Sequence, residues 1–289
     1  MTLATTRSLV AGAVNNKRAV LAFNVITLEH AEGIVAGVER ANGQALLQVS
    51  ENAVRFHGGQ LAPILAACAR VAEESTAPIA IHLDHFQDLA MTERALEQAA
   101  GLGVSSIMVD ASGLGYTLNV QRTLGLAQLA HDLGLWVEAE LGEIGGKDGA
   151  HAPGVRTDPD DARDFVRQTS VDGLAVAVGS SHAMTSQDAQ LDLDLIGTLA
   201  AQLPVPLILH GSSGVADSAL SNAIRAGIRK VNVGTALNVA FTREIRRYLQ
   251  SNPEVTDPRK YLAEGREAIA RAVSHLCVVV DPEHRTQTK

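Results

Sequence analysis

Short apolar runs alternate with longer amphipathic stretches along most of the chain. The short runs consist mainly of Val, Ile, Leu and Ala, which favours buried strands, whereas the longer stretches place apolar residues at helical spacing. The expected strands are residues 19–24, 44–50, 79–84, 105–110, 135–140, 173–178, 207–210 and 230–233. Eight strands alternating with helices fit a single α/β domain over residues 1–289, a (β/α)₈ (TIM) barrel with residues 251–289 as a C-terminal helical extension.

A polar residue stands at or just beyond the end of each expected strand. In chain order these residues are Asn24, Ser50, Asp84, Asp110, Glu140, His182, His210 and Asn232. The carboxyl ends of barrel strands meet on one face, and enzymes with this architecture keep their active sites there. The pattern therefore predicts an active site assembled from several strands.

Charge and composition narrow the range of partners. The chain has a formal net charge of −8 and no cluster of Lys and Arg, so nucleic acid is not an expected partner. Its apolar runs are far shorter than the roughly 20 residues that a membrane helix needs. The N-terminal segment also lacks the features of a secretion signal. We therefore expect a cytoplasmic protein that does not associate with membranes.

Three histidines follow expected strands three, six and seven at corresponding positions. They are His85, His182 and His210. One histidine alone in such a place is more often a hydrogen-bonded core or rim residue, but three that converge match a known catalytic zinc arrangement with an open fourth position. Asp110 and Glu140 end neighbouring strands, and we expect them either to support the histidines or to offer an alternative metal position.

Two glycine-containing turns follow the last two expected strands. They are residues 210–215 (HGSSGV) and 232–238 (NVGTALN). Backbone N–H groups in such turns bind phosphate well, particularly when a helix begins there. Barrels often place a phosphate site after strands seven and eight. The turns therefore predict a small phosphorylated substrate.

Seven ordered motifs run through nearly the whole chain: AFNV, HLDH, SSIMVDAS, VEAELGEIGG, AVAVGSSH, LILHGSSG and KVNVGTALN. With these motifs the sequence resembles the class II, metal-dependent ketose-bisphosphate aldolases, a family that has the barrel fold. The resemblance implies a lyase of carbohydrate metabolism that cleaves or forms a ketose phosphate, with dihydroxyacetone phosphate as one fragment. It also implies zinc, or another divalent metal, as a Lewis acid, with no covalent intermediate.

The resemblance further implies roles for individual residues. The metal ligands would be His85, His182 and His210, with the acidic residues Glu140 and Asp110 close to the metal. Asp84 would be the acid/base acting on the aldehyde oxygen, and Asn232 would contact the bound ketose. Gly211, Ser213 and Thr235 would hold the phosphate. From the strand pattern itself, Ser50 and the segment after it either contact the far end of the substrate or form an ordinary exposed loop.

Three positions depart from the family pattern. The loop after strand five usually carries a glutamate that removes the substrate proton, whereas here Asp148 is the nearest acid and Glu143 is a second candidate. Ala183 replaces a common glycine after the second metal histidine, which bears on the binding of phosphate or of a monovalent cation. Gly234 stands where fructose-bisphosphate members tend to have Asp, which points away from a standard glycolytic enzyme.

Several alternatives stay open from the sequence. The aldehyde fragment is either glyceraldehyde 3-phosphate or a different aldehyde, such as a malonate semialdehyde. A metal-dependent hydrolase on the same barrel and a non-catalytic partner subunit are further candidates. A Schiff-base aldolase would need a buried lysine at a strand end, but Lys230 begins expected strand eight and is predicted to face the opposite end. A homodimer or homotetramer is the expected assembly.

Overall fold

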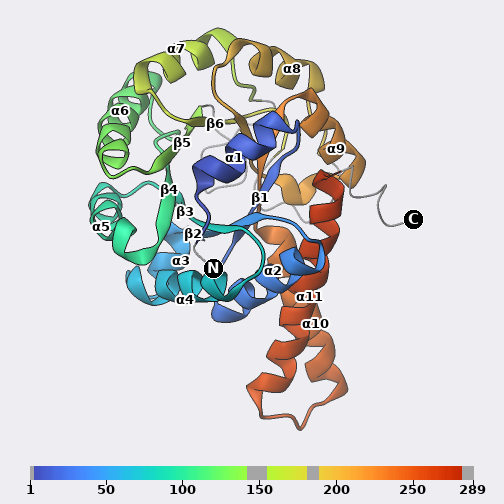
Figure 1. The fold of residues 1–289 in the computed structure, drawn as a ribbon. Coiled ribbons are helices and arrows are strands. Elements are labelled where there is room, and N and C mark those ends of the chain that lie inside the picture. Colours follow the sequence, from blue (N-terminus) through green and yellow to red (C-terminus); the bar gives the residue numbers. More distant parts are fainter. Residues whose placement is uncertain (1–2, 142–154, 181–188, 282–289) are drawn as a thin grey trace.

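The computed structural model describes residues 3–141, 155–180 and 189–281. Its strands form a closed parallel barrel in the order β1 to β8, which confirms the predicted fold (Figure 1). The strands are β1 (Val20–Asn24), β2 (Ala45–Ser50), β3 (Ile79–Phe86), β4 (Val104–Val109), β5 (Trp136–Leu141), β6 (Gly173–Val176), β7 (Leu207–Leu209) and β8 (Ile228–Val233). Every bound lies within two residues of the expected one.

Most of the helices surround the barrel and connect its strands. The helices are α1 (Thr6–Asn15), α2 (Leu28–Arg40), α3 (Glu51–Phe56), α4 (Ala62–Glu74), α5 (Leu89–Ala99), α6 (Tyr116–Asp132), α7 (Pro159–Thr169), α8 (Leu193–Gln202), α9 (Asp217–Ala226), α10 (Thr235–Ser251) and α11 (Pro258–Val280). Of these, α1 precedes β1, and α10 and α11 follow β8. Two short 3₁₀ helices, Ala100–Leu102 and Ser212–Gly214, lie in connections. None of these helices is long and apolar enough to cross a membrane.

The barrel interior changes from apolar to polar along the strands. Helix α1 lies across one end of the barrel (Figure 1) and buries Leu9 and Val10 against interior residues that include Leu46 and Trp136. Because alternate residues of a strand share a face, the next interior positions of β2 and β5 are two residues further on. These positions are Gln48 and Glu138, both fully buried. The polar half of the interior therefore lies towards the carboxyl ends of the strands.

Helices α10 and α11 form a hairpin that extends away from the barrel (Figure 1). Helix α10 begins directly after β8, and α11 returns to pack against α2. At this contact α2 has two glycines, Gly33 and Gly37, one turn apart. A Cβ atom built on Gly37 would lie 2.5 Å from the carbonyl oxygen of Ala270 and 2.7 Å from Cβ of Val273. Because these two glycines have no side chains, α11 can pack closely against α2.

Replacing Gly37 by alanine is expected to lower the free energy of unfolding by about 1–3 kcal/mol, because α11 has to move away from α2 to make room. Gly125 of α6 is the matched control, since a Cβ there meets no atom within 4 Å. Alanine is the better helix former, so Gly125→Ala is expected to add up to about 1 kcal/mol. Denaturant unfolding of both variants tests this, and equal stability of the two variants would contradict the close approach.

Candidate active site

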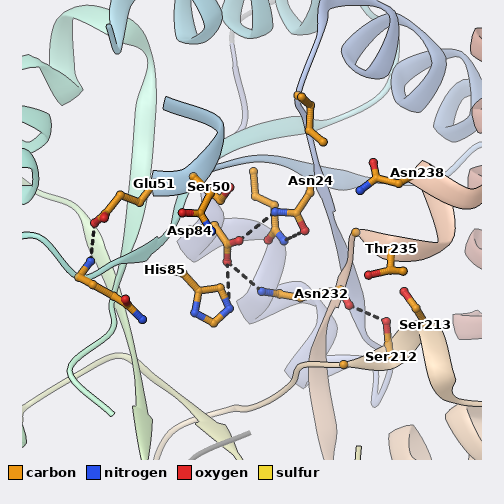
Figure 2. Close-up of a pocket in the computed structure, with 16 residues that line it drawn as sticks. Asn24, Ser50, Glu51, Asp84, His85, Ser212, Ser213, Asn232, Thr235 and Asn238 are labelled. Carbon is orange, nitrogen blue, oxygen red and sulfur yellow. Dashed lines mark hydrogen bonds and ion pairs between the residues drawn. The ribbon is translucent and has the colours of Figure 1, made fainter. Parts of the chain in front are cut away.

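The carboxyl ends of the strands surround a cavity of about 260 Å³ (Figure 2). Its lining comes from strands that are far apart in the sequence and includes Ser50, Asp84, His85, Gly211, Asn232 and Thr235. All of these except Ser50 were predicted to contribute to the site from their place at a strand end or in a glycine turn, and for Ser50 a substrate contact was one of two predicted alternatives. Parallel closure of the barrel brings them together, because every strand ends on the same face.

A backbone irregularity at the end of β3 places His85 at the mouth of the barrel. The register of β3 against β4 shifts between Leu83 and Phe86, and His85 has a φ of +50°. Non-glycine residues seldom adopt this left-handed conformation, and such residues often mark functional sites. The bulge re-aims the side chain, so that the imidazole faces His210 although Asp84 next to it also faces the cavity.

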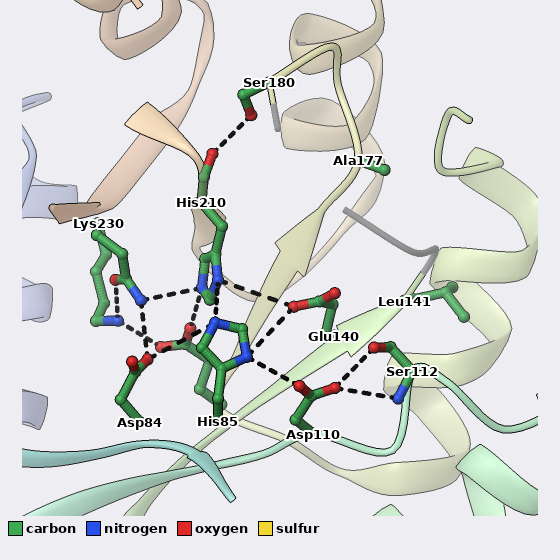
Figure 3. Close-up of polar contacts among 12 residues, drawn as sticks. Asp84, His85, Asp110, Ser112, Glu140, Leu141, Ala177, Ser180, His210 and Lys230 are labelled. Carbon is green, nitrogen blue, oxygen red and sulfur yellow. Dashed lines mark hydrogen bonds and ion pairs between the residues drawn. The ribbon is translucent and has the colours of Figure 1, made fainter. Parts of the chain in front are cut away.

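Three side chains lie close enough together to form a candidate metal site. The group consists of His85, Glu140 and His210, and each offers one ligand atom within 4.8 Å of the others. Nε2 of His85 lies 3.0 Å from Nδ1 of His210, and Oε2 of Glu140 lies 3.8 Å from the same Nδ1 (Figure 3). Two imidazoles and a carboxylate are typical ligands of zinc and related divalent ions.

The outward-facing ring nitrogen of each histidine contacts a carboxylate. Nδ1 of His85 lies 2.9 Å from Oδ2 of Asp110, and Nε2 of His210 lies 2.9 Å from Oε1 of Glu138. If both nitrogens donate to these carboxylates, the lone pairs of the two inner nitrogens face each other, so that a proton or a cation has to lie between them. Metal-binding histidines are commonly oriented in this way. The residues present therefore fit a divalent metal ion.

Burial favours the neutral histidine that a metal ion requires. His210 is fully buried, and this loss of hydration lowers its pKa, although the hydrogen bond to Glu138 opposes the change. The carboxylate of Glu138 stays ionised. Burial alone would raise the pKa of Glu138, but the charge of Lys230 and the hydrogen bond to His210 together lower it.

Asp84 is held by two side-chain amides. Asn24 donates to its Oδ2 at 2.9 Å, and Asn232 donates to its Oδ1 at 3.2 Å. Burial opposes ionisation of Asp84, but the neighbouring His85, His210, His82 and Lys230 outweigh it and lower the pKa of Asp84 to about 2. At neutral pH it is therefore a carboxylate with a fixed orientation, in the ionised state that a group needs to accept a proton from a substrate hydroxyl.

The two glycine turns lie side by side at the cavity. Gly211 has a φ of +67°, and the Ser213 hydroxyl accepts a hydrogen bond from the N–H of Ala236 in the first turn of α10 at 3.0 Å. Helix α10 begins at Thr235, so its positive end faces the cavity. The turns and the helix N-terminus form a site suited to an anion.

Gly234 leaves room for Asn24. A Cβ atom on Gly234 would lie 2.7 Å from Oδ1 of Asn24, which also accepts a hydrogen bond from Gln48 at 2.8 Å. A side chain at position 234 would therefore displace the amide that orients Asp84.

A model of the family "Fructose-bisphosphate aldolase class-II" matches residues 4–285, which is nearly the whole chain. The chain belongs to this family. Family membership makes it a class II aldolase, an aldehyde-lyase that catalyses aldol cleavage, and the resemblance inferred from the motifs is confirmed.

Solved structures agree with this assignment over almost their full length. The YdjI aldolase from Escherichia coli K12 has 27% sequence identity and a TM-score of 0.80, and the match covers 97% of this chain and 98% of that one. A putative fructose-1,6-biphosphate aldolase from Coccidioides immitis has 25% identity and a TM-score of 0.85, with 98% of each chain covered. Fructose-bisphosphate aldolase from Campylobacter jejuni, at 20% identity, has the same fold, with a TM-score of 0.81 and coverage of 97% of this chain and 96% of that chain.

Several of the predicted site residues of this aldolase can be placed in its structure. Asp110 contacts the outward nitrogen of His85 and also accepts a hydrogen bond from Ser112 at 2.7 Å, which favours its supporting role over direct metal binding. The Ser50 hydroxyl caps α3 by accepting from the N–H of Ala53 at 3.2 Å. His182, Ala183, Asp148 and Glu143 lie outside the described residues, so their roles remain predictions.

Two residues one layer deeper in the aldolase were not predicted from the sequence. Glu138 and Lys230 stand two residues before Glu140 and Asn232, and both are fully buried. The prediction that Lys230 faces the opposite end was wrong. Its Nζ lies 2.6 Å from Oδ1 of Asn232 and 2.7 Å from Oε2 of Glu138 (Figure 3), because the third residue of β8 points into the barrel and the long side chain reaches upwards. The shared period-2 face of these pairs was the signal that could have found them.

Proposed function

We propose that the enzyme is a zinc-dependent aldolase that reversibly cleaves a ketose phosphate into dihydroxyacetone phosphate and an aldehyde. One observation carries this proposal: the metal-ligand group of His85, Glu140 and His210 stands beside the oriented carboxylate of Asp84 and the two phosphate-suited turns. Class II family membership supports metal dependence and a small phosphorylated substrate.

The ligands of the zinc ion would be His85 and His210, with His182 as the third histidine predicted from the sequence and Glu140 close by. When bound, the ion supplies Lewis-acid stabilisation of negative charge on the substrate oxygens. Asp110 and Glu138 hold the two described histidines with their ligand nitrogens directed inward.

In the cleavage direction Asp84 would take the proton from the hydroxyl that becomes the aldehyde oxygen, and in condensation it would return that proton. Its neighbours Asn24 and Asn232 keep both carboxylate oxygens in place. Asp148, or Glu143, stays the predicted base for the carbon-bound proton.

The phosphate of the ketose would bind to the turns at Gly211, Ser213, Gly234 and Thr235. Their support is the start of α10 at the cavity and the left-handed backbone of Gly211. Ala183 follows a metal histidine, and its contribution to phosphate or monovalent-cation binding remains a prediction. The aldehyde fragment would lie towards Ser50, on the β2 side of Asp84.

A Schiff-base mechanism is not favoured, although Lys230 is buried in the barrel interior. Its Nζ lies between Glu138 and Asn232, and Lys230 does not line the described part of the cavity. The lysine therefore lacks a path to a substrate carbonyl group. Cytoplasmic location and assembly into two or four copies are further parts of the proposal.

The proposal is tested by incubating the zinc-loaded protein with dihydroxyacetone phosphate in deuterated water and following the C–H signal by NMR. We expect stereospecific exchange, seen as the loss of one C–H signal. A chelator should abolish this exchange, and added zinc should restore it. No exchange in fully zinc-loaded protein would overturn the proposal and favour a non-catalytic subunit. Release of inorganic phosphate instead would favour the hydrolase.

A further inference from the structure

A buried ion pair lies directly beneath the site. Lys230 and Glu138 are both fully buried, and their charged groups are 2.7 Å apart. Burying two charges is costly, and an apolar pair of similar size often gives an equally stable or more stable protein. Stability alone therefore does not account for the pair, whose two members also contact groups at the site.

Lys230 determines which way the amide of Asn232 points. An ammonium group only donates hydrogen bonds, so the atom of Asn232 that lies 2.6 Å from Nζ has to be the carbonyl oxygen Oδ1. The NH₂ group then faces the other way and donates to Asp84 Oδ1 at 3.2 Å. Without Lys230 the amide is free to turn over and present its oxygen to the carboxylate of Asp84, which repels it.

Glu138 connects the same pair to His210. Oε2 of Glu138 faces Lys230, and Oε1 lies 2.9 Å from Nε2 of His210. If Nδ1 of His210 is to bind a metal ion, Nε2 has to carry the ring proton, and it then donates to Glu138. The NH₂ group of Asn232 lies close to Nε2 but cannot share a hydrogen bond with it, because both groups are donors, and it donates to Asp84. One charged pair therefore sets the hydrogen-bonding direction of two groups at the site.

We propose that Lys230 is a positioning residue of the reaction, which acts by fixing the side-chain amide of Asn232 towards Asp84 and the substrate. This inference rests on the proposed function and adds a residue that touches neither the substrate nor the metal. It predicts that the effect of Lys230 on catalysis depends on Asn232.

A double-mutant cycle with Lys230→Met, Asn232→Ala and the combined variant tests this dependence. With zinc saturating, Lys230→Met is expected to lower kcat about 10- to 100-fold in the wild-type background. In the Asn232→Ala background the same change should alter kcat about twofold or less, because the amide that Lys230 orients is already absent. Zinc content and thermal unfolding are measured on every variant. An equal loss of kcat in both backgrounds would show that Lys230 acts independently of Asn232, through general stability or through Glu138 and His210, and would overturn the proposal.

A second comparison covers the case in which Lys230→Met does not fold because it leaves Glu138 charged and unpaired. The Glu138→Gln substitution removes that charge. The double variant that carries both Glu138→Gln and Lys230→Met is therefore compared with the single variant Glu138→Gln. We again expect a 10- to 100-fold loss of kcat, with KM for the ketose phosphate changing much less and the unfolding temperature recovering. Recovery of kcat together with stability would overturn the proposal. A wild-type enzyme that is active but insensitive to Lys230→Met would overturn this inference alone, whereas an inactive zinc-loaded wild type would overturn the proposed function as well.

Discussion

Replacing Asp84 by asparagine is expected to lower kcat for ketose phosphate cleavage by about 100- to 10,000-fold, the range typical for loss of a general acid–base residue. Exchange of the C–H proton of dihydroxyacetone phosphate should persist, because that step does not use the aldehyde oxygen. The substitution keeps the size of the side chain but replaces one acceptor oxygen by an NH₂ group, which then faces the donating amide of Asn24 or Asn232. Steady-state cleavage and deuterium exchange are measured on the same zinc-loaded preparation.

Asp132→Asn is the matched control for this prediction. Asp132 is an exposed residue at the end of α6 and does not line the cavity. The control variant is expected to match the wild type in both assays. If Asp84→Asn loses exchange and cleavage to the same degree, Asp84 contributes to metal or ketose binding, and its assignment to the aldehyde oxygen is wrong.

Replacing His210 by alanine is expected to remove both zinc and activity. His210 supplies one of the described ligand atoms and is fully buried, so no other side chain can take its place without rearrangement. Lewis-acid stabilisation is worth several kcal/mol, which corresponds to a fall in kcat/KM of about 1,000-fold or more. Zinc should raise the unfolding temperature of the wild type, since a ligand that binds only the folded state stabilises it, but should leave that of the variant unchanged.

The control for His210 is His275→Ala, at an exposed histidine that pairs with Asp217 at 2.7 Å on the protein surface. Exposed pairs contribute little to stability, so this variant should retain its zinc and its activity. Stoichiometric zinc and substantial activity in purified His210→Ala would mean that the metal is held elsewhere, and the metal centre described above would have to be abandoned.

The outer parts of the site could be predicted from the sequence because, in a barrel, a residue at the carboxyl end of any strand lies on the same face. A buried parallel strand is apolar along its length, so a polar residue such as Asp84 or His210 stands out where the strand ends. Since all eight ends lie on one face, their convergence followed once the barrel had been recognised. The glycine turns at Gly211 and Gly234 were found for a similar reason, because each follows a strand directly.

The deeper and more irregular parts could not be predicted in the same way. Glu138 and Lys230 lie inside strands, where the period-2 pattern indicates that each shares a face with Glu140 or Asn232 but does not indicate which side chains it contacts. Long side chains add to the difficulty, because the ammonium of Lys230 reaches a level two residues above its own Cα. The left-handed backbone of His85 depends on the register shift between β3 and β4, which is a tertiary property.

The close approach of Gly234 to Asn24 has a consequence for how such an enzyme can change over generations. A side chain at position 234 requires a different residue, or a different rotamer, at position 24, and the support of Asp84 has to be rebuilt in the same step. The two positions are far apart in the sequence but are not independent targets of mutation. Among descendants of this enzyme, a side chain at position 234 is therefore expected to be accompanied by a changed rotamer or a changed residue at position 24.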